Sequence, residues 1–159
     1  MAVDYHMKFD GIQGESLDWI LQKQIRLLSW NWGANNLSSV ASGSGSGAGK
    51  VNLDEFSFIT EFDKASPKFF KSICAGTHIR TGTMTAAKAG ALLGMPYLTM
   101  DFKGVFITGV QNSASWEIPA VNVVFSYEEI TIEYRIQKAD GSLVSTGPIA
   151  YNLKENKLS

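Results

Sequence analysis

The stretch DKASPKFFKSICAG, residues 63–76, is the segment of this 159-residue chain with the best-bounded helical pattern. Ser66 is placed to accept the free amide hydrogens of a first turn, and Pro67 follows where its missing N–H costs nothing. Gly76 supplies the left-handed residue with which helices commonly end. The sequence therefore predicts a helix over about residues 66–75.

The apolar side of this helix indicates what the rest of the chain must provide. One apolar stripe is expected, with Ser72 off it and with Phe69, Phe70, Ile73 and Cys74 on it. A helix of about ten residues is not stable alone in water. Burial of two Phe and one Ile, each worth about 1.5–3 kcal/mol, must hold it against another layer.

The remainder of the chain alternates as strands do. Apolar residues recur at every second position from Val3 to Phe9, which indicates a half-buried strand. In residues 25–32 the alternation slips between Leu27 and Leu28, so either a β-bulge lies there or both faces are covered. Residues 15–24 fit a short helical turn or a loop equally well.

Further strands are expected along the second half of the chain. Residues 121–136 fit either one strand with a phase change or two strands around a tight corner, and Asp140–Gly141 is a hairpin signal. The other expected strands cover residues 51–62, 79–88, 97–110 and 148–153. About seven strands and one helix predict a mainly β fold, a sandwich or a barrel.

Composition excludes several classes of function. The net charge of −1 and the 18% charged residues imply neither a nucleic-acid groove nor an anionic membrane partner. One cysteine allows no internal disulfide. The N-terminus lacks the basic and apolar regions of a cleaved signal peptide, and no apolar run is long enough to cross a membrane. We expect a single domain over residues 1–159.

The glycine-rich segment SSVASGSGSGAG, residues 38–49, does not predict a phosphate site. A phosphate loop ending at Gly49 and Lys50 requires glycine at position 44, where the chain has Ser44. Val51 stands where a magnesium-binding hydroxyl is needed, and a strand follows instead of a helix. No cofactor is therefore expected.

No catalytic or metal site is expected either. Cys74 and His78 are four residues apart, but structural roles are favoured because Cys74 is predicted to be buried and His78 lies beyond the helix end. The adjacent acidic pairs 54–55 and 128–129 point to opposite faces of a strand and cannot converge on one ion. Trp19 and Trp116 lie in polar contexts, where an interface and incidental packing are equally plausible.

Taken in order, the chain resembles the Hcp (haemolysin co-regulated protein) family, the inner-tube protein of the bacterial type VI secretion system. The pieces that carry the resemblance are MAVDYHMKFDGIQGES (1–16), IRLLSWNWG (25–33), GAGKV (47–51), FSFITEFDKASPKFFKSICAGTH (56–78), TAAKAG (85–90), YLTMDFKGVFITGV (97–110), PAVNVVFSYEEITIEY (119–134) and QKADG (137–141).

The resemblance implies a two-sheet β-barrel flanked by one helix, with no enzymatic activity. It implies homohexameric rings that stack into a tube inside a contractile sheath and are expelled with spike and baseplate proteins as partners and small effectors in the lumen. It further implies a protein made in the cytoplasm and secreted without a signal peptide, with no C-terminal effector extension.

The resemblance also suggests where subunits meet. The family's extended loop corresponds to residues 35–50, and its candidate assembly residues here are Asn35, Ser42, Gly43, Gly45, Gly47, Gly49 and Lys50. Candidate interface residues are Trp19, Ile20 and Trp116.

The chain departs from the family pattern at two places. LDWILQKQ, residues 17–24, replaces a charged segment, and Val121 stands where a Glu is common. Two other functions remain as alternatives. One is a monomeric β-barrel that binds a small ligand in an apolar cavity, and the other is a hydrolase that uses Cys74.

Overall fold

The computed structural model describes residues 2–18, 21–38, 48–88, 95–115 and 117–159. Twelve strands and one helix lie in these ranges, so the expectation of about seven strands was too low, mainly because short strands at the hairpin and near the C-terminus were missed. The elements are β1 Val3–Phe9, β2 Ile25–Asn31, β3 Ala34–Ser38, β4 Ala48–Leu53, β5 Phe56–Glu61, α1 Ser66–Ala75, β6 His78–Lys88, β7 Leu98–Ser113, β8 Ala120–Ser126, β9 Glu129–Gln137, β10 Leu143–Ser145, β11 Ile149–Asn152 and β12 Lys157–Leu158.

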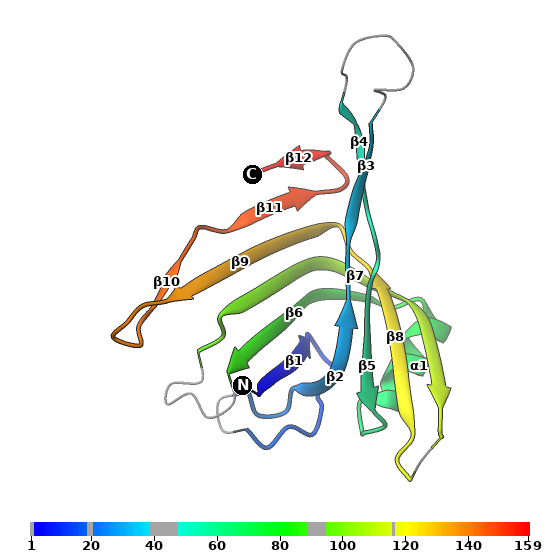
Figure 1. The fold of residues 1–159 in the computed structure, drawn as a ribbon. Coiled ribbons are helices and arrows are strands. Elements are labelled where there is room, and N and C mark those ends of the chain that lie inside the picture. Colours follow the sequence, from blue (N-terminus) through cyan, green and yellow to red (C-terminus); the bar gives the residue numbers. More distant parts are fainter. Residues whose placement is uncertain (1, 19–20, 39–47, 89–94, 116) are drawn as a thin grey trace.

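Six strands close into a barrel in the order β7-β6-β1-β2-β5-β8, because β8 returns to pair with β7. The first part of β7 pairs with β6 on one side and β9 on the other, and its last part pairs with β8. From β9 the sheet continues through β11 to β12, outside the closed barrel (Figure 1). The predicted mainly β barrel with one flanking helix is confirmed.

Two open alternatives in the strand pattern are resolved. The pairing of β2 with β5 shifts between Leu27 and Ser29, which confirms a β-bulge, and Leu28 points outward, 53% exposed. Residues 121–136 form two strands around a corner at Tyr127 and Glu128. Both strands pair with β7, but their other neighbours differ, because β8 pairs with β5 whereas β9 pairs with β10 and β11.

Six phenylalanines fill the barrel interior: Phe9, Phe56, Phe58, Phe69, Phe102 and Phe125, all buried. Phe125 is central, with ring centroids 5.0 Å from Phe102, 5.2 Å from Phe56 and 5.5 Å from Phe9. The helix contributes Phe69, which meets Phe9 edge-on at 5.9 Å. Such edge-to-face pairs add to the stabilisation that burial of the rings provides.

The helix begins differently from the prediction. Ala65 is the N-cap, and Ser66 is the first helical residue, so the predicted cap at Ser66 is wrong. The chain enters through a turn in which Asp63 Oδ1 accepts the Ala65 N–H at 2.8 Å, and buried Ser66 Oγ accepts the Asp63 N–H at 3.0 Å. The predicted end is confirmed: Gly76 has φ 63° and its N–H donates to the Ser72 carbonyl.

The buried side of α1 is rotated relative to the predicted stripe. Ser66, Phe69 and Ser72 face the barrel, whereas Phe70 is 63% exposed and Cys74 is exposed. The prediction that Phe70 and Cys74 are buried is therefore wrong. Ser72 can be buried because its hydroxyl donates to the Lys68 carbonyl at 2.9 Å, so no polar group is left unpaired.

Candidate assembly surfaces

A β-hairpin made of β3 and β4 projects beyond the barrel (Figure 1). Its strands pair with each other, Asn35 with Asn52 and Asn36 with Val51, in a sheet separate from the barrel sheet. The prediction of one long loop over residues 35–50 is wrong, because backbone pairing extends over both ends of that segment. Asn35 lies in β3, and Gly49 and Lys50 lie in β4.

The remaining predicted assembly residues, Ser42, Gly43, Gly45 and Gly47, lie outside the described residues, as do the predicted interface residues Trp19, Ile20 and Trp116.

Two aromatic side chains fix the base of the hairpin. Trp32, which follows β2, donates its indole N–H to the Tyr127 hydroxyl at 2.6 Å. That hydroxyl donates in turn to the Asp54 carbonyl, just after β4, at 2.7 Å. Burial raises the pKa of Tyr127, so the phenol stays protonated and keeps its donor role. Sequence reasoning missed this bridge, and the aromatic residues beside Gly33 and at the β8 corner were the available signal.

The strands that continue beyond the barrel present an open apolar face. In β9, Ile132 pairs with Met100 and Tyr134 pairs with Leu98 of β7. Directly paired residues project on the same side of a sheet, so these side chains continue the face that forms the barrel core. We call this surface the open apolar face and define it as Ile132, Tyr134, Ile136, Val144, Ile149, Tyr151 and Leu158.

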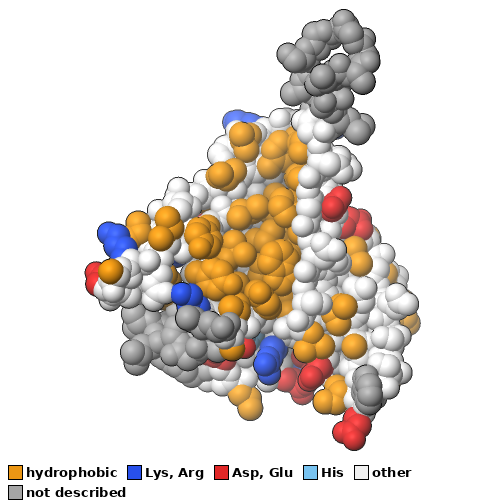
Figure 2. All heavy atoms as spheres, in the orientation of Figure 1, with side chains coloured by type: hydrophobic (Ala, Val, Ile, Leu, Met, Phe, Trp, Pro, Cys, Tyr) orange, Lys and Arg blue, Asp and Glu red, His pale blue; other side chains and the backbone are white. Residues whose placement is uncertain are grey.

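Much of the open apolar face is accessible. Exposed fractions reach 49% for Tyr134, 54% for Ile136, 42% for Val144, 62% for Ile149 and 69% for Leu158. Figure 2 shows hydrophobic side chains gathered over β7, β9 and β11 beside the hairpin. A large contiguous apolar area on a protein surface marks an interaction site.

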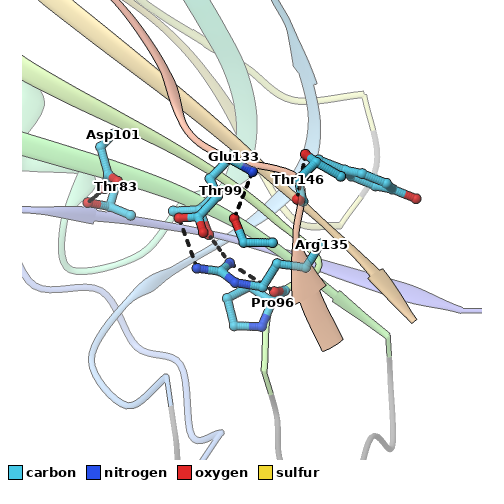
Figure 3. A network of polar contacts seen from close by, with 10 residues as sticks. Thr83, Pro96, Thr99, Asp101, Glu133, Arg135 and Thr146 are labelled. Atoms are coloured by element: carbon cyan, nitrogen blue, oxygen red, sulfur yellow. Dashed lines mark hydrogen bonds and ion pairs between the residues drawn. The ribbon is translucent and has the colours of Figure 1, made fainter. Parts of the chain in front are cut away.

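The other side of the same strands is polar and internally bonded. Arg135 of β9 lies 3.0 Å from the Glu133 carboxylate, and its guanidinium donates to the Pro96 carbonyl and Thr99 Oγ1, both at 3.3 Å (Figure 3). Thr83 donates to Asp101 at 2.8 Å on the neighbouring strands. Among the described residues, one side of this sheet makes polar contacts of its own, and the apolar side stays partly exposed.

Cys74 and His78, the residues weighed as a nucleophile and a base, lie on different elements. Cys74 is exposed on α1, while His78 begins β6 with its ring 5.2 Å from that of Phe106. No group of three or more His, Cys, Asp or Glu in this part of the chain could hold a metal ion. Within the same ranges, no helix has the length and apolarity needed to cross a membrane.

The sequence and the fold match known proteins over nearly their whole lengths. The family described as "Type VI secretion system effector, Hcp" matches residues 6–134. Protein hcp1 of Pseudomonas aeruginosa is 33% identical over 160 residues, covering 98% of both chains.

Solved structures agree with this match. A type six secretion system protein superposes with a TM-score of 0.93 at 27% identity, covering 99% of this chain and all of the other. Hcp1 of Salmonella typhimurium superposes with a TM-score of 0.80 at 30% identity over the whole of both chains.

Proposed function

The chain belongs to the Hcp family of type VI secretion proteins, and from this premise we propose that it is a structural subunit of the secretion system's inner tube. Six copies form a ring, rings stack into the tube, and the tube is expelled with effectors in its lumen. The other partners are the contractile sheath, the spike and the baseplate. The subunit is made in the cytoplasm, leaves through the type VI system without a cleaved signal, and is not an enzyme.

The observation that carries this proposal is the open apolar face. It lies on one side of the molecule, on strands that continue the barrel sheet, with exposed Tyr134, Ile136 and Ile149. A ring requires each copy to present one surface to the next copy's different surface. An apolar face of this kind is stable in water when such a neighbour covers it.

The alternative of a monomeric ligand-binding barrel has less support. A small-ligand site requires a concave, mostly apolar cavity. Here the barrel interior is occupied by the six phenylalanines, of which Phe56, Phe69 and Phe125 have no exposed surface. The aromatic side chains that suggested a cavity are the ones that fill it.

A test introduces charge into the open apolar face. Ile149→Asp removes an apolar contact worth about 1.5–3 kcal/mol and adds a charge that must be desolvated, so each interface should weaken by roughly ten- to a hundredfold or more. We expect native mass spectrometry and negative-stain electron microscopy to show six-fold rings for the unsubstituted protein and monomers for the variant.

Phe70→Asp is the matched control, since Phe70 is an exposed apolar residue on α1, away from this face. Its rings should persist. Monomers of the unsubstituted protein at every concentration, or rings of the Ile149→Asp variant at the usual concentration, would contradict the proposal.

A further inference from the structure

A surface pocket of about 490 Å³ lies over the outer side of β1 and β2. His6 and Arg26 are directly paired across these strands, opposite to the core residues Met7 and Ile25. The chain at residues 15–18 and the turn from β5 into α1 complete the wall. We call this the acidic pocket, because its lining includes five carboxylates: Asp4, Glu15, Asp18, Glu61 and Asp63.

The positive charge in the lining is small by comparison. Arg26 is its one cationic side chain, and its guanidinium is 3.9 Å from Asp4 with a side chain that is 74% exposed. Burial, with an additional contribution from the charge of Glu15, raises the pKa of Asp63. The chain as a whole carries a net charge of only −1, so negative charge is concentrated at this place.

His6 is an independent indication of a binding site. It lines the pocket but is only 2% exposed, and its Nδ1 has no hydrogen-bond partner, while Nε2 lies 3.3 Å from Ser16 Oγ. A buried polar atom without a partner is unusual in a folded protein. Burial lowers the pKa of His6, although Asp18 and Asp4 favour its charged form and Arg26 opposes it. The imidazole is therefore neutral near pH 7 and adds no charge that would repel a cation.

The lining also includes apolar side chains. Leu17, Leu28 and Phe62 are all exposed and border the carboxylates. Apolar surface beside carboxylates suits a ligand with an alkyl stem and a cationic end, because such a stem packs on apolar atoms while the charge remains near water and acceptors. A guanidinium can also bind a carboxylate through two parallel hydrogen bonds.

We propose that the acidic pocket binds an alkyl cation of the guanidinium or ammonium type, with its charge among the carboxylates and its stem on Leu28 and Phe62. Two sources offer this chemistry: an arginine or lysine side chain of another polypeptide, or a free polyamine. The pocket is lined by residues of a single copy of the chain, so the site and the tube can be tested separately.

The test is calorimetric titration at low ionic strength with N-acetyl-arginine methylamide, compared with its neutral isostere N-acetyl-citrulline methylamide. The unsubstituted protein should bind the arginine compound saturably and bind the citrulline compound at least about fivefold more weakly. The double variant Glu15→Gln/Glu61→Gln should lose about fivefold or more in affinity, the effect expected for two exposed ion pairs.

The matched control is Glu117→Gln/Glu155→Gln, which removes the same charge at exposed positions outside the pocket and should change affinity by less than about twofold. Spermidine and a capped tri-arginine peptide, which carry the same charge of +3, are titrated at the same ionic strength to distinguish the sources: tighter binding of spermidine indicates a polyamine, and tighter binding of the peptide indicates a polypeptide side chain. Three results would overturn the proposal: equal affinity for the arginine and citrulline compounds, an equal loss of affinity in both double variants, or no saturable binding of the arginine compound. Ring formation is scored separately for each variant by native mass spectrometry.

Discussion

Ser66 shows how one side chain can stabilise a helix start without capping it. Its hydroxyl accepts the Asp63 N–H, outside the helix, while Asp63 holds the Ala65 N–H. The two residues fix the turn by which the chain passes from β5 into α1. The sequence pattern, a serine followed by proline, fits a cap equally well, because it does not show which residue first adopts helical dihedral angles.

Ser66→Ala should lower the free energy of unfolding by about 1–3 kcal/mol, since the Asp63 N–H would lose its partner in a buried place. Ser72→Ala is the control, because the Lys68 carbonyl that Ser72 Oγ contacts also has a helical acceptor role. Urea unfolding in the Ile149→Asp background, where we expect monomers, measures both changes in stability. An equal loss of stability in the two variants would show that the missing hydrogen bond from the Asp63 N–H is not its cause.

Tyr127 links stability to alkaline pH. Its folded pKa is raised above the ordinary value of 10.0, mainly by burial. The folded state then holds a proton that the unfolded state releases above pH 10, so the free energy of unfolding falls as pH rises from there through the folded pKa. Spectrophotometric titration near 295 nm and urea unfolding at several pH values should show both effects.

Tyr127→Phe should reduce the loss of stability at alkaline pH. At pH 7 it should lower the free energy of unfolding by about 1–3 kcal/mol, because the Trp32 indole N–H and the Asp54 carbonyl would lose their hydrogen-bond partner. Tyr97→Phe serves as a comparison, because the pKa of Tyr97 is also raised but this residue does not bridge the hairpin base. An unchanged pH dependence in Tyr127→Phe would show that this phenol is not responsible.

At the scale of elements, the hairpin is a paired stem whose strands are linked by residues 39–47, and a deletion should keep the paired strands intact. Removing residues 40–46 keeps β3 and β4 and leaves a two-residue connection ending in Gly47, which suits a hairpin turn. The six barrel strands lie outside the deleted segment, so the free energy of unfolding should change by less than about 0.5 kcal/mol.

We expect rings of the deletion variant to persist in native mass spectrometry, while stacked tubes become fewer in electron micrographs, because projecting loops are suited to contacts between assemblies. The comparison is a deletion of residues 42–49, which also removes Ala48, the β4 residue that pairs with Ser38. Tubes of ordinary length and number from the first deletion would rule out a role for residues 40–46 in stacking.

At the scale of the whole molecule, the sequence predicts the barrel well and the open apolar face poorly. Alternation identified β1, because a strand with one buried face has a period of two. It also located the irregularity at Leu27 and Leu28, but left a bulge and two covered faces as alternatives. The same alternation runs through Ile130, Ile132 and Ile136, of which only Ile130 is fully buried. Period alone cannot distinguish a face that is covered within the chain from one left for a neighbour.

The helix and the hairpin also differ from what the sequence pattern alone predicts. Phe70 and Phe69 are adjacent and identical in type, and only the docking of α1 on the barrel decides which is buried. Glycine and serine in residues 38–49 indicated a loop, yet pairing with β3 continues to Ala48. Contacts between elements decide which side of the helix is buried and how far the hairpin strands pair, and the local sequence pattern does not show these contacts.

Strand β7 has a mechanical consequence. Its 16 residues belong both to the barrel, through β6 and β8, and to the outer strands, through β9. A force applied to β9 along the strand direction would load the β7–β9 hydrogen bonds in shear, so that they resist together instead of opening one at a time. The load would pass into the closed barrel along one unbroken backbone, which would suit the proposed role as a subunit of an expelled tube.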